Sequence, residues 1–265
     1  MADTPLLEIR DVHKHFAAIQ VLRGVNMTVR AGEVTALVGD NGAGKSTLIK
    51  CLAGINQLDG GQIIWEGQPV HIANPKAAAA IGIEFVYQDL ALCNNLDIVQ
   101  NMFLGREKVS GPFLDDEAME DLARETLAGL NVTTIRSIRQ QVSSLSGGQR
   151  QSVAVAKAVM WNSKLVVLDE PTAALGVAQT AQVLALVRRL ADRGLGVIII
   201  SHNLEDVLKV ADSIAVLRLG VLVAQPRKDE VSSRELVELI TTGRSGTRFP
   251  GTPIQSDAAS AAVAH

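Results

Sequence analysis

Short apolar runs and longer stretches with helical spacing alternate along most of the chain. At the start, apolar residues alternate or cluster over strand lengths, which predicts strands in LLEIRDVHKHF, GVNMTV and EVTALVG. The spacing lengthens in KSTLIKCLAG, directly after three glycines, and this change predicts a strand, a glycine turn and a helix. In GGQIIWEGQPVHI, strand-forming residues flank Glu66 and Gly67, which predicts a hairpin.

The middle of the chain, from about residue 88 to residue 161, has a helical pattern. Its stretch DDEAMEDLARETLAGL begins with acids, which are favourable at a helix N-terminus. The apolar positions that recur there are Met119, Leu122, Ala123, Leu127 and Leu130. Strand signals resume in KLVVLDE and GVIIISH, separated by the amphipathic QTAQVLALVRRLADRG. The sequence therefore predicts an α/β fold with a parallel sheet, into which a helical block is inserted.

The composition excludes several classes of protein. The 265 residues are 47% hydrophobic with a net charge of −3, so a general nucleic-acid binder is disfavoured. The longest apolar runs have strand length and are shorter than a membrane span requires. The N-terminus lacks the pattern of a secretory signal, and we expect a cytoplasmic protein. Beyond residue 242 the periodicity is lost, which predicts a disordered tail over residues 243–265.

The two cysteines do not predict a disulfide scaffold or a zinc site. Cys51 and Cys93 are far apart in the sequence, and neither has a CxxC partner. We expect both to be small packing residues.

The glycine turn between a predicted strand and a predicted helix has the pattern G-x4-G-K-[ST] over residues 39–46. Glycines let backbone amides approach a phosphate closely, and the N-terminal end of the following helix adds positive potential. Lys45 is expected to pair with the β- and γ-phosphates of a nucleotide, and the Ser46 hydroxyl to hold Mg²⁺. The bland alternative is a flexible turn with an accidental lysine. The residues assigned to nucleotide binding in this loop are Gly39, Asn41, Gly42, Gly44, Lys45, Ser46 and Thr47.

A second candidate element is the acidic pair that ends the buried run LVVLDE. If both acids lie on the strand, they point to opposite sides of it. Asp169 is then expected to support Mg²⁺, and Glu170 to address the attacking water. Each acid alone could equally be a solvated charge at a strand end.

The stretch LSGGQRQSVAVAKAV, residues 145–159, predicts a helix capped by Ser146 with its first amides exposed, which is another candidate anion site. It resembles the signature motif of ATP-binding cassette (ABC) ATPases. The resemblance spans residues 6–242 and implies the P-loop NTPase core of that family, with an N-terminal antiparallel β subdomain and a helical subdomain at about residues 89–161. It also implies that Phe16 stacks on adenine, that Gln88 links Mg²⁺ to a membrane partner, and that His202 lies near the γ-phosphate. Taken singly, these three residues have ordinary structural explanations.

Two such cassettes meet head to tail in the family. The resemblance therefore implies an ATP-dependent homodimer, in which the signature residues Ser146, Gly147, Gly148 and Gln149 of one chain contact the γ-phosphate held by Lys45 of the other. One position departs from the pattern. The family usually has Ser-Ala-Leu-Asp after DEPT, whereas this chain has Gly176 in place of the aspartate that communicates between the two sites.

Within the family, the stretches FVYQDLALCNNLDIVQNMFLGRE, DEPTAALGV and SHNLEDVLKVADSIAVLRLG resemble the ATPase subunits of simple-sugar importers, particularly single-cassette, fructose-type members. The resemblance implies ATP and Mg²⁺ as cofactors and a peripheral location on the inner face of the cell membrane. It also implies integral-membrane permeases as partners and, indirectly, a periplasmic sugar-binding protein. We expect a permease groove near residues 88–104, where the apolar character exceeds that of an ordinary loop; packing of the helical block is the alternative.

Three other functions compete with sugar import. A soluble cassette ATPase acting on ribosomes or DNA is the first, although the chain lacks a second cassette and long coiled coils. A subunit that transports another substrate also remains open. A simple nucleotide kinase would use the phosphate loop and has no need of LSGGQ.

Overall fold

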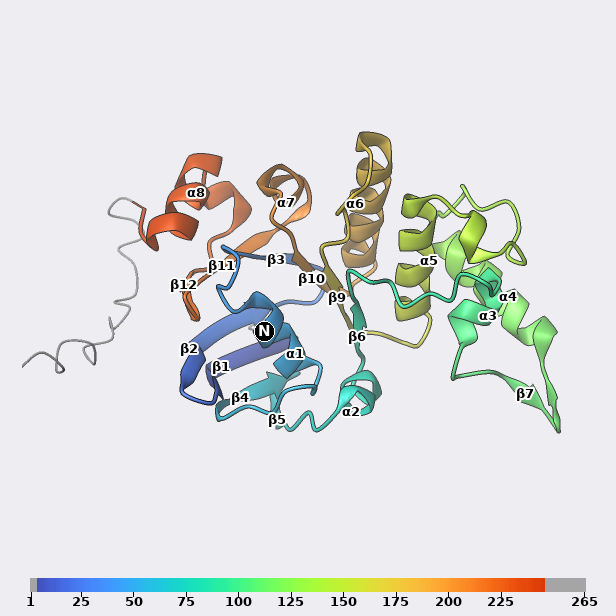
Figure 1. Ribbon diagram of the computed structural model, residues 1–265, viewed down its shortest axis with the longest axis horizontal. Coiled ribbons are helices and arrows are strands. Elements are labelled where there is room, and N and C mark those ends of the chain that lie inside the picture. The colour runs from blue at the N-terminus through green and yellow to red at the C-terminus, as the bar shows by residue number, and fades with distance from the viewer. Residues whose placement is uncertain (1–3, 246–265) are drawn as a thin grey trace, which may run out of the picture.

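The computed structural model describes residues 4–245. Figure 1 shows a small antiparallel sheet at one side, a larger sheet in the centre and a group of helices at the other side. Of the predicted tail, residues 246–265 lie outside the described residues. No helix among residues 4–245 combines the length and apolar character that crossing a membrane requires.

The N-terminal strands form an antiparallel sheet with the order β2-β1-β4-β5. Its members are β1 (Leu7–Phe16), β2 (Ile19–Val29), β4 (Gly60–Trp65) and β5 (Gln68–Val70). The hairpin predicted around Glu66 and Gly67 joins β4 to β5, and both turn residues have positive φ. The predicted antiparallel β subdomain is therefore present.

The central sheet has the order β12-β11-β3-β10-β9-β6, and only β12 runs antiparallel to its neighbour. Its strands are β3 (Val34–Val38), β6 (Ile83–Val86), β9 (Leu165–Asp169), β10 (Gly196–Ile200), β11 (Ser213–Arg218) and β12 (Val221–Ala224). Strands β3 and β10 are buried throughout, as expected when both faces of a parallel sheet are covered. Because β3, β9 and β10 are neighbours, the residues that follow them meet at one edge.

Separate hydrophobic clusters cover the two faces of the central sheet. Leu37 of β3 packs into one cluster with β1, β2 and α1 (Lys45–Leu52), whereas Ala36 and Val38 pack into the other. This alternation follows from the two-residue period of a strand. The remaining helices around the sheet are α2 (Pro75–Ala80), α6 (Val177–Asp192), α7 (Leu204–Val210), α8 (Ser233–Thr242) and the 3₁₀ turn Lys228–Glu230.

The inserted block contains α3 (Ile98–Phe103), α4 (Asp116–Gly129), the 3₁₀ turn Val142–Ser144 and α5 (Gly147–Val159). Figure 1 shows α5 between α6 and the pair α3 and α4, and α5 contacts all three. The expected helical pattern does not hold at residues 109–114, where β7 (Val109–Ser110) and β8 (Phe113–Leu114) form a hairpin. Two-residue strands are too short to produce a readable period, and Gly111 at φ +62° turns the chain between them.

Candidate active site

The turn between β3 and α1 contains three glycines with positive φ, Gly39, Gly42 and Gly44. A Cβ atom on Gly39 would lie 2.1 Å from the carbonyl oxygen of Leu217, so no side chain fits there. A Cβ atom on Gly42 would meet nothing within 4 Å and would point into open space. The backbone itself therefore forms the surface of this loop, as the glycine pattern predicts.

The loop is held in place by the turn between β11 and β12. The Gly220 amide donates a hydrogen bond of 2.9 Å to the carbonyl oxygen of Ala43, and Leu217 packs beside Gly44. The loop therefore packs against residues that are about 180 positions away in the sequence.

The Lys45 ammonium donates to two carbonyl oxygens at the start of the same loop, that of Gly39 at 2.6 Å and that of Asp40 at 3.0 Å. Burial lowers the pKa of Lys45, while the charges of Glu170, Asp40 and Asp169 oppose that shift. The ammonium is thus fixed over the loop, within range of the charges of Asp40, Asp169 and Glu170.

A cavity of about 480 Å³ adjoins the loop. Its walls are residues 41–47 together with Val21, Gln88, Asp169, Glu170 and Ile200. Sequence reasoning assigned most of these residues to one site, and the fold brings them around one cavity, although Val21, Ala43 and Ile200 were not foreseen. Burial, and then the charge of Glu170, raise the pKa of Asp169, while Lys45 and Lys50 lower it. The cavity therefore gathers backbone amides, a lysine, two hydroxyls and two carboxylates.

Glu170 does not continue strand β9, which ends at Asp169. Its φ of +49° turns the chain, and its amide donates to the Ile200 carbonyl oxygen at 3.0 Å. The premise that both acids lie on the strand is therefore wrong. The turn after β9, held to β10, sets the direction of the Glu170 side chain.

His202 follows β10, and its Nδ1 lies 2.8 Å from Oε2 of Glu170. The His202 side chain is 73% exposed, whereas that of Glu170 is 17% exposed. His202 also lines a second cavity of about 320 Å³, which it shares with Gly39, Asp40 and Asn41. The histidine therefore lines a cavity beside the start of the loop, and its ring reaches Glu170.

A further contact that sequence reasoning missed joins the turn after β9 to α7. The Thr172 hydroxyl donates to Oδ2 of Asp206 at 3.0 Å, and Asp206 is a buried carboxylate. The only signal in the sequence is an acid in the first turn of the helix after His202, where helix-dipole effects alone could explain it. Together with the Glu170 amide, this contact fixes the acidic turn to the β10–α7 segment.

Phe16 ends β1 at the tip of a hairpin and is 45% exposed. It belongs to neither hydrophobic cluster, and the Lys14 amine lies 5.4 Å from its ring centroid. It does not line the 480 Å³ cavity. The residue of the same sheet that does is Val21. The phenylalanine is thus a surface aromatic, and its ring is open to a ligand from outside.

Ser146 caps α5, as predicted. Its hydroxyl accepts from the Gln149 amide, and the Gln149 side chain accepts from the Ser146 amide, which completes a capping box. Gly147 and Gly148 pack closely on Leu175, which precedes α6, and on Gln179 in the first turn of α6. These four signature residues do not line the cavity beside Lys45. Within one chain, the two candidate anion sites are therefore separate.

The sequence matches the ABC transporter family over residues 22–173. The chain belongs to the ABC transporter family. This finding confirms the resemblance carried by LSGGQ and, with it, the prediction of an ABC-type ATPase.

Curated relatives cover nearly the whole chain. The xylose/arabinose import ATP-binding protein XylG of Sulfolobus acidocaldarius is 47% identical, over 89% of this chain and 94% of its own length. The fructose import ATP-binding protein FrcA of Rhizobium meliloti is 42% identical, over 94% of this chain and 98% of its own length.

The fold agrees with this membership. The structure of MJ1267, an ATP-binding cassette of an ABC transporter in its ADP conformation, superposes with a TM-score of 0.77 at 26% identity. It covers 90% of this chain and 95% of that one. The predicted fold class, an ABC-type core with an antiparallel β subdomain, is confirmed.

Proposed function

We propose that this ABC ATPase is the energy-supplying subunit of a carbohydrate importer. The observation that carries the proposal is the cavity that surrounds Lys45 with Ser46, Gln88, Asp169 and Glu170. The names of the relatives, which import xylose, arabinose and fructose, support the substrate class. Because the matches cover almost the full length of both relatives, the chain can be compared with each of them as a whole.

The loop amides and Lys45 bind the phosphates of ATP. On binding, the ammonium exchanges the carbonyl oxygens of Gly39 and Asp40 for phosphate oxygens. Asn41 and Thr47, the first and last residues of the lining stretch 41–47, contact the same phosphates. Phe16 offers its exposed ring to the adenine from the antiparallel sheet.

Ser46, Gln88 and Asp169 fit Mg²⁺, since all three offer oxygen atoms to the same cavity. The raised pKa of Asp169 supports this assignment, because burial and the charge of Glu170 disfavour the ionised carboxylate, and a bound cation would stabilise it. Once bound, Mg²⁺ would offset the charge of the β- and γ-phosphates. Glu170 polarises the attacking water, and His202 holds the Glu170 carboxylate in position through its Nδ1 contact.

The signature residues act on a second copy of the chain. Since Ser146, Gly147, Gly148 and Gln149 lie away from the cavity of their own chain, they bind the γ-phosphate of the ATP held by a partner. ATP thereby stabilises a closed homodimer, and hydrolysis releases it. Integral-membrane permeases convert this cycle into transport, so the chain works at the inner face of the membrane with a periplasmic sugar-binding protein upstream. Nucleic acid has no role.

Two measurements test the proposal separately. Release of phosphate from ATP by the purified chain with Mg²⁺ tests the ATPase, and the Glu170→Gln variant is its control. Uptake of labelled xylose, fructose and ribose by cells that lack the gene, complemented with wild type or with Glu170→Gln, tests import. ATP hydrolysis without restored uptake of any sugar would favour a soluble cassette ATPase or a transporter of another substrate.

A further inference from the structure

The acidic turn, which follows β9 and begins at Glu170, has an unfavourable backbone. Glu170 has φ +49° and Ala174 has φ +58°, in the left-handed region that residues other than glycine rarely adopt. Within the turn, the Ala173 amide donates to the Glu170 carbonyl oxygen at 3.1 Å. Such a backbone persists only where its surroundings hold it in place. The direction of the Glu170 side chain therefore depends on what anchors the turn from outside.

Two side-chain contacts anchor this turn to the segment after β10. One is the contact of Glu170 with His202, whose side chain is 73% exposed. The other is the bond of 3.0 Å from the Thr172 hydroxyl to Asp206, whose side chain is 5% exposed. Water competes for the exposed contact and is excluded from the buried one, so the buried bond is the stronger anchor.

Asp206 is itself fixed relative to the end of β10. Its amide donates to Oδ1 of Asn203, the N-cap of α7, at 3.3 Å, and the Asn203 amide donates to the buried Ser201 hydroxyl at 3.0 Å. The Lys209 amine lies 3.8 Å from Oδ1 of Asp206 and is largely exposed. Asp206 does not line the 480 Å³ cavity, so its influence on the reaction passes through other residues.

We propose that Asp206 is a positioning residue for ATP hydrolysis, which holds the acidic turn through the Thr172 hydroxyl so that Glu170 points at the attacking water. This inference rests on the proposed catalytic role of Glu170 and adds the residue that orients it. Loss of the bond would release the turn two residues from Glu170, whereas Lys45 and the phosphate loop follow a different strand. The chemical step would slow and nucleotide binding would be retained.

The test breaks the bond from each side and also replaces each partner conservatively. Thr172→Val keeps the shape of the side chain and removes the hydroxyl. It should lower kcat for phosphate release at least ~10-fold and leave the Kd of a non-hydrolysable ATP analogue within ~2-fold, since only the orientation of Glu170 is lost. Thr172→Ser, which keeps the hydroxyl, should retain kcat. Asp206→Ala should reproduce Thr172→Val, and Asp206→Asn, whose amide oxygen still accepts the bond, should retain kcat. Thermal unfolding shows which variants are folded, and either disrupting variant suffices.

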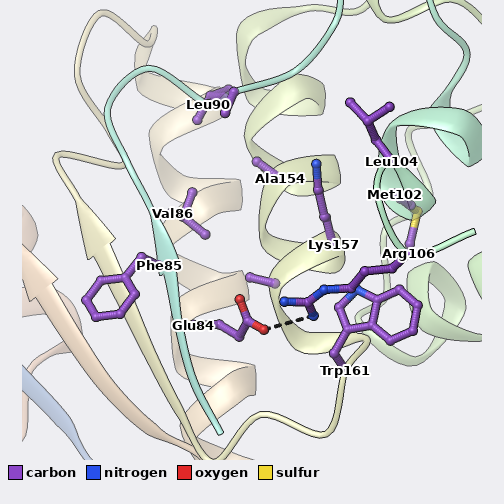
Figure 2. Close-up of a pocket in the computed structure, with 12 residues that line it drawn as sticks. Glu84, Phe85, Val86, Leu90, Met102, Leu104, Arg106, Ala154, Lys157 and Trp161 are labelled. Atoms are coloured by element: carbon purple, nitrogen blue, oxygen red, sulfur yellow. Dashed lines mark hydrogen bonds and ion pairs between the residues drawn. The ribbon is translucent and has the colours of Figure 1, made fainter. Parts of the chain in front are cut away.

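Two control variants separate positioning from a general loosening of the fold. Thr35→Val also removes a buried hydroxyl, which lies 3.1 Å from Oγ of Ser213 and joins β3 to β11. Arg106→Met breaks the bond of 3.1 Å to Oε1 of Glu84 that joins the inserted block to β6 (Figure 2). Both variants should have the kcat of the wild-type chain, because neither contact involves the acidic turn.

A double variant distinguishes an effect on Glu170 from damage elsewhere. In Glu170→Gln no carboxylate remains to be oriented, so adding Thr172→Val should not lower the residual rate further. The same fold-loss in both backgrounds, or wild-type kcat in Thr172→Val, would overturn the proposal and leave the catalytic role of Glu170 standing. Wild-type kcat in Glu170→Gln would overturn both.

Discussion

The carboxylate of Glu170 and the imidazole of His202 are joined by a contact of 2.8 Å between Oε2 and Nδ1. The two residues follow adjacent parallel strands, β9 and β10, and the Glu170 amide is bonded to the carbonyl oxygen of Ile200. The carboxylate is thus fixed by its backbone and by its side chain before nucleotide binds. This rigidity suits the role proposed for Glu170, which requires it to hold a water molecule in one orientation.

The Glu170→Gln variant should bind ATP and hydrolyse it ~10²- to 10⁴-fold more slowly, because the amide keeps the shape and loses the acceptor charge. If intact ATP bridges Lys45 and Ser146 across two chains, as proposed, the variant should accumulate as an ATP-bound homodimer. Size-exclusion chromatography with light scattering, with ATP and with ADP, measures this. Normal hydrolysis would remove the catalytic role of Glu170, whereas an inactive monomer that binds ATP would point to the permease as the scaffold of dimerisation.

Replacing Lys45 by Ala should weaken ATP binding and abolish turnover. The variant loses the ammonium and keeps the loop amides, so residual binding is expected. Fluorescent ATP titration and phosphate release measure the two effects. Lys228→Ala, which removes an exposed lysine outside the cavity, is the control. Unchanged affinity in Lys45→Ala would contradict the assignment of the phosphate loop.

Phe16 should contribute to affinity without selecting the base. An exposed ring face stacks on any purine and reads little of its edge, so GTP should compete appreciably with ATP. The Phe16→Ala variant should bind both nucleotides more weakly. Competition titrations check this. Complete rejection of GTP by the wild-type chain would contradict the stacking hypothesis.

Gly176 should accept an aspartate without damage to the fold. It is the N-cap of α6 at φ −73°, and a Cβ atom there meets nothing within 4 Å. Aspartate is also a better N-cap than glycine by a few tenths of a kcal/mol, so the free energy of unfolding should not fall. Because the neighbouring Leu175 and Gln179 pack on the signature glycines, Gly176→Asp should change the Hill coefficient of ATP hydrolysis. Identical cooperativity in both proteins would show that Gly176 acts only as a turn residue.

The buried thiol of Cys51 predicts a specific pH dependence. Cys51 is 3% exposed, and burial raises the pKa of its thiol from 9.0 to about 11. The unfolded chain therefore releases the thiol proton from about pH 9, while the folded chain retains it up to about pH 11. The stabilisation that this side chain provides is present below pH 9 and is lost as the pH rises to 11. Urea unfolding of wild type and Cys51→Ala at pH 7.5 and 10.5 should show the difference shrinking, and a constant difference would refute the linkage.

The sequence predicted the parts of the site that one short segment contains. The loop around Lys45, the cap at Ser146 and the strand that ends at Asp169 each combine a local period with local turn chemistry, and the structure has all three. The assignment of roles to these residues stays a prediction.

Other features depend on contacts between distant segments and could not be read locally. The direction of Glu170 is set by a positive φ and by a bond to β10, neither of which leaves a trace in the run LVVLDE. The bond between Thr172 and Asp206 joins residues whose types are ordinary at a turn and at a helix start. Hairpin β7–β8 was missed because its strands contain two residues each.

The support of the phosphate loop by the turn after β11 bears on how the chain can be shortened. The stretch that matches the family, residues 22–173, contains the loop and ends well before Leu217 and Gly220, on which the loop rests. A fragment trimmed to that stretch would retain every residue of the motif and lose the backbone against which Gly39 and Ala43 are packed. Its glycines, free of their neighbour, would sample many conformations, and nucleotide binding would have to restore the missing order. The binding motif is one contiguous stretch of the sequence. The ordered loop that binds nucleotide, however, depends on residues from both ends of the cassette.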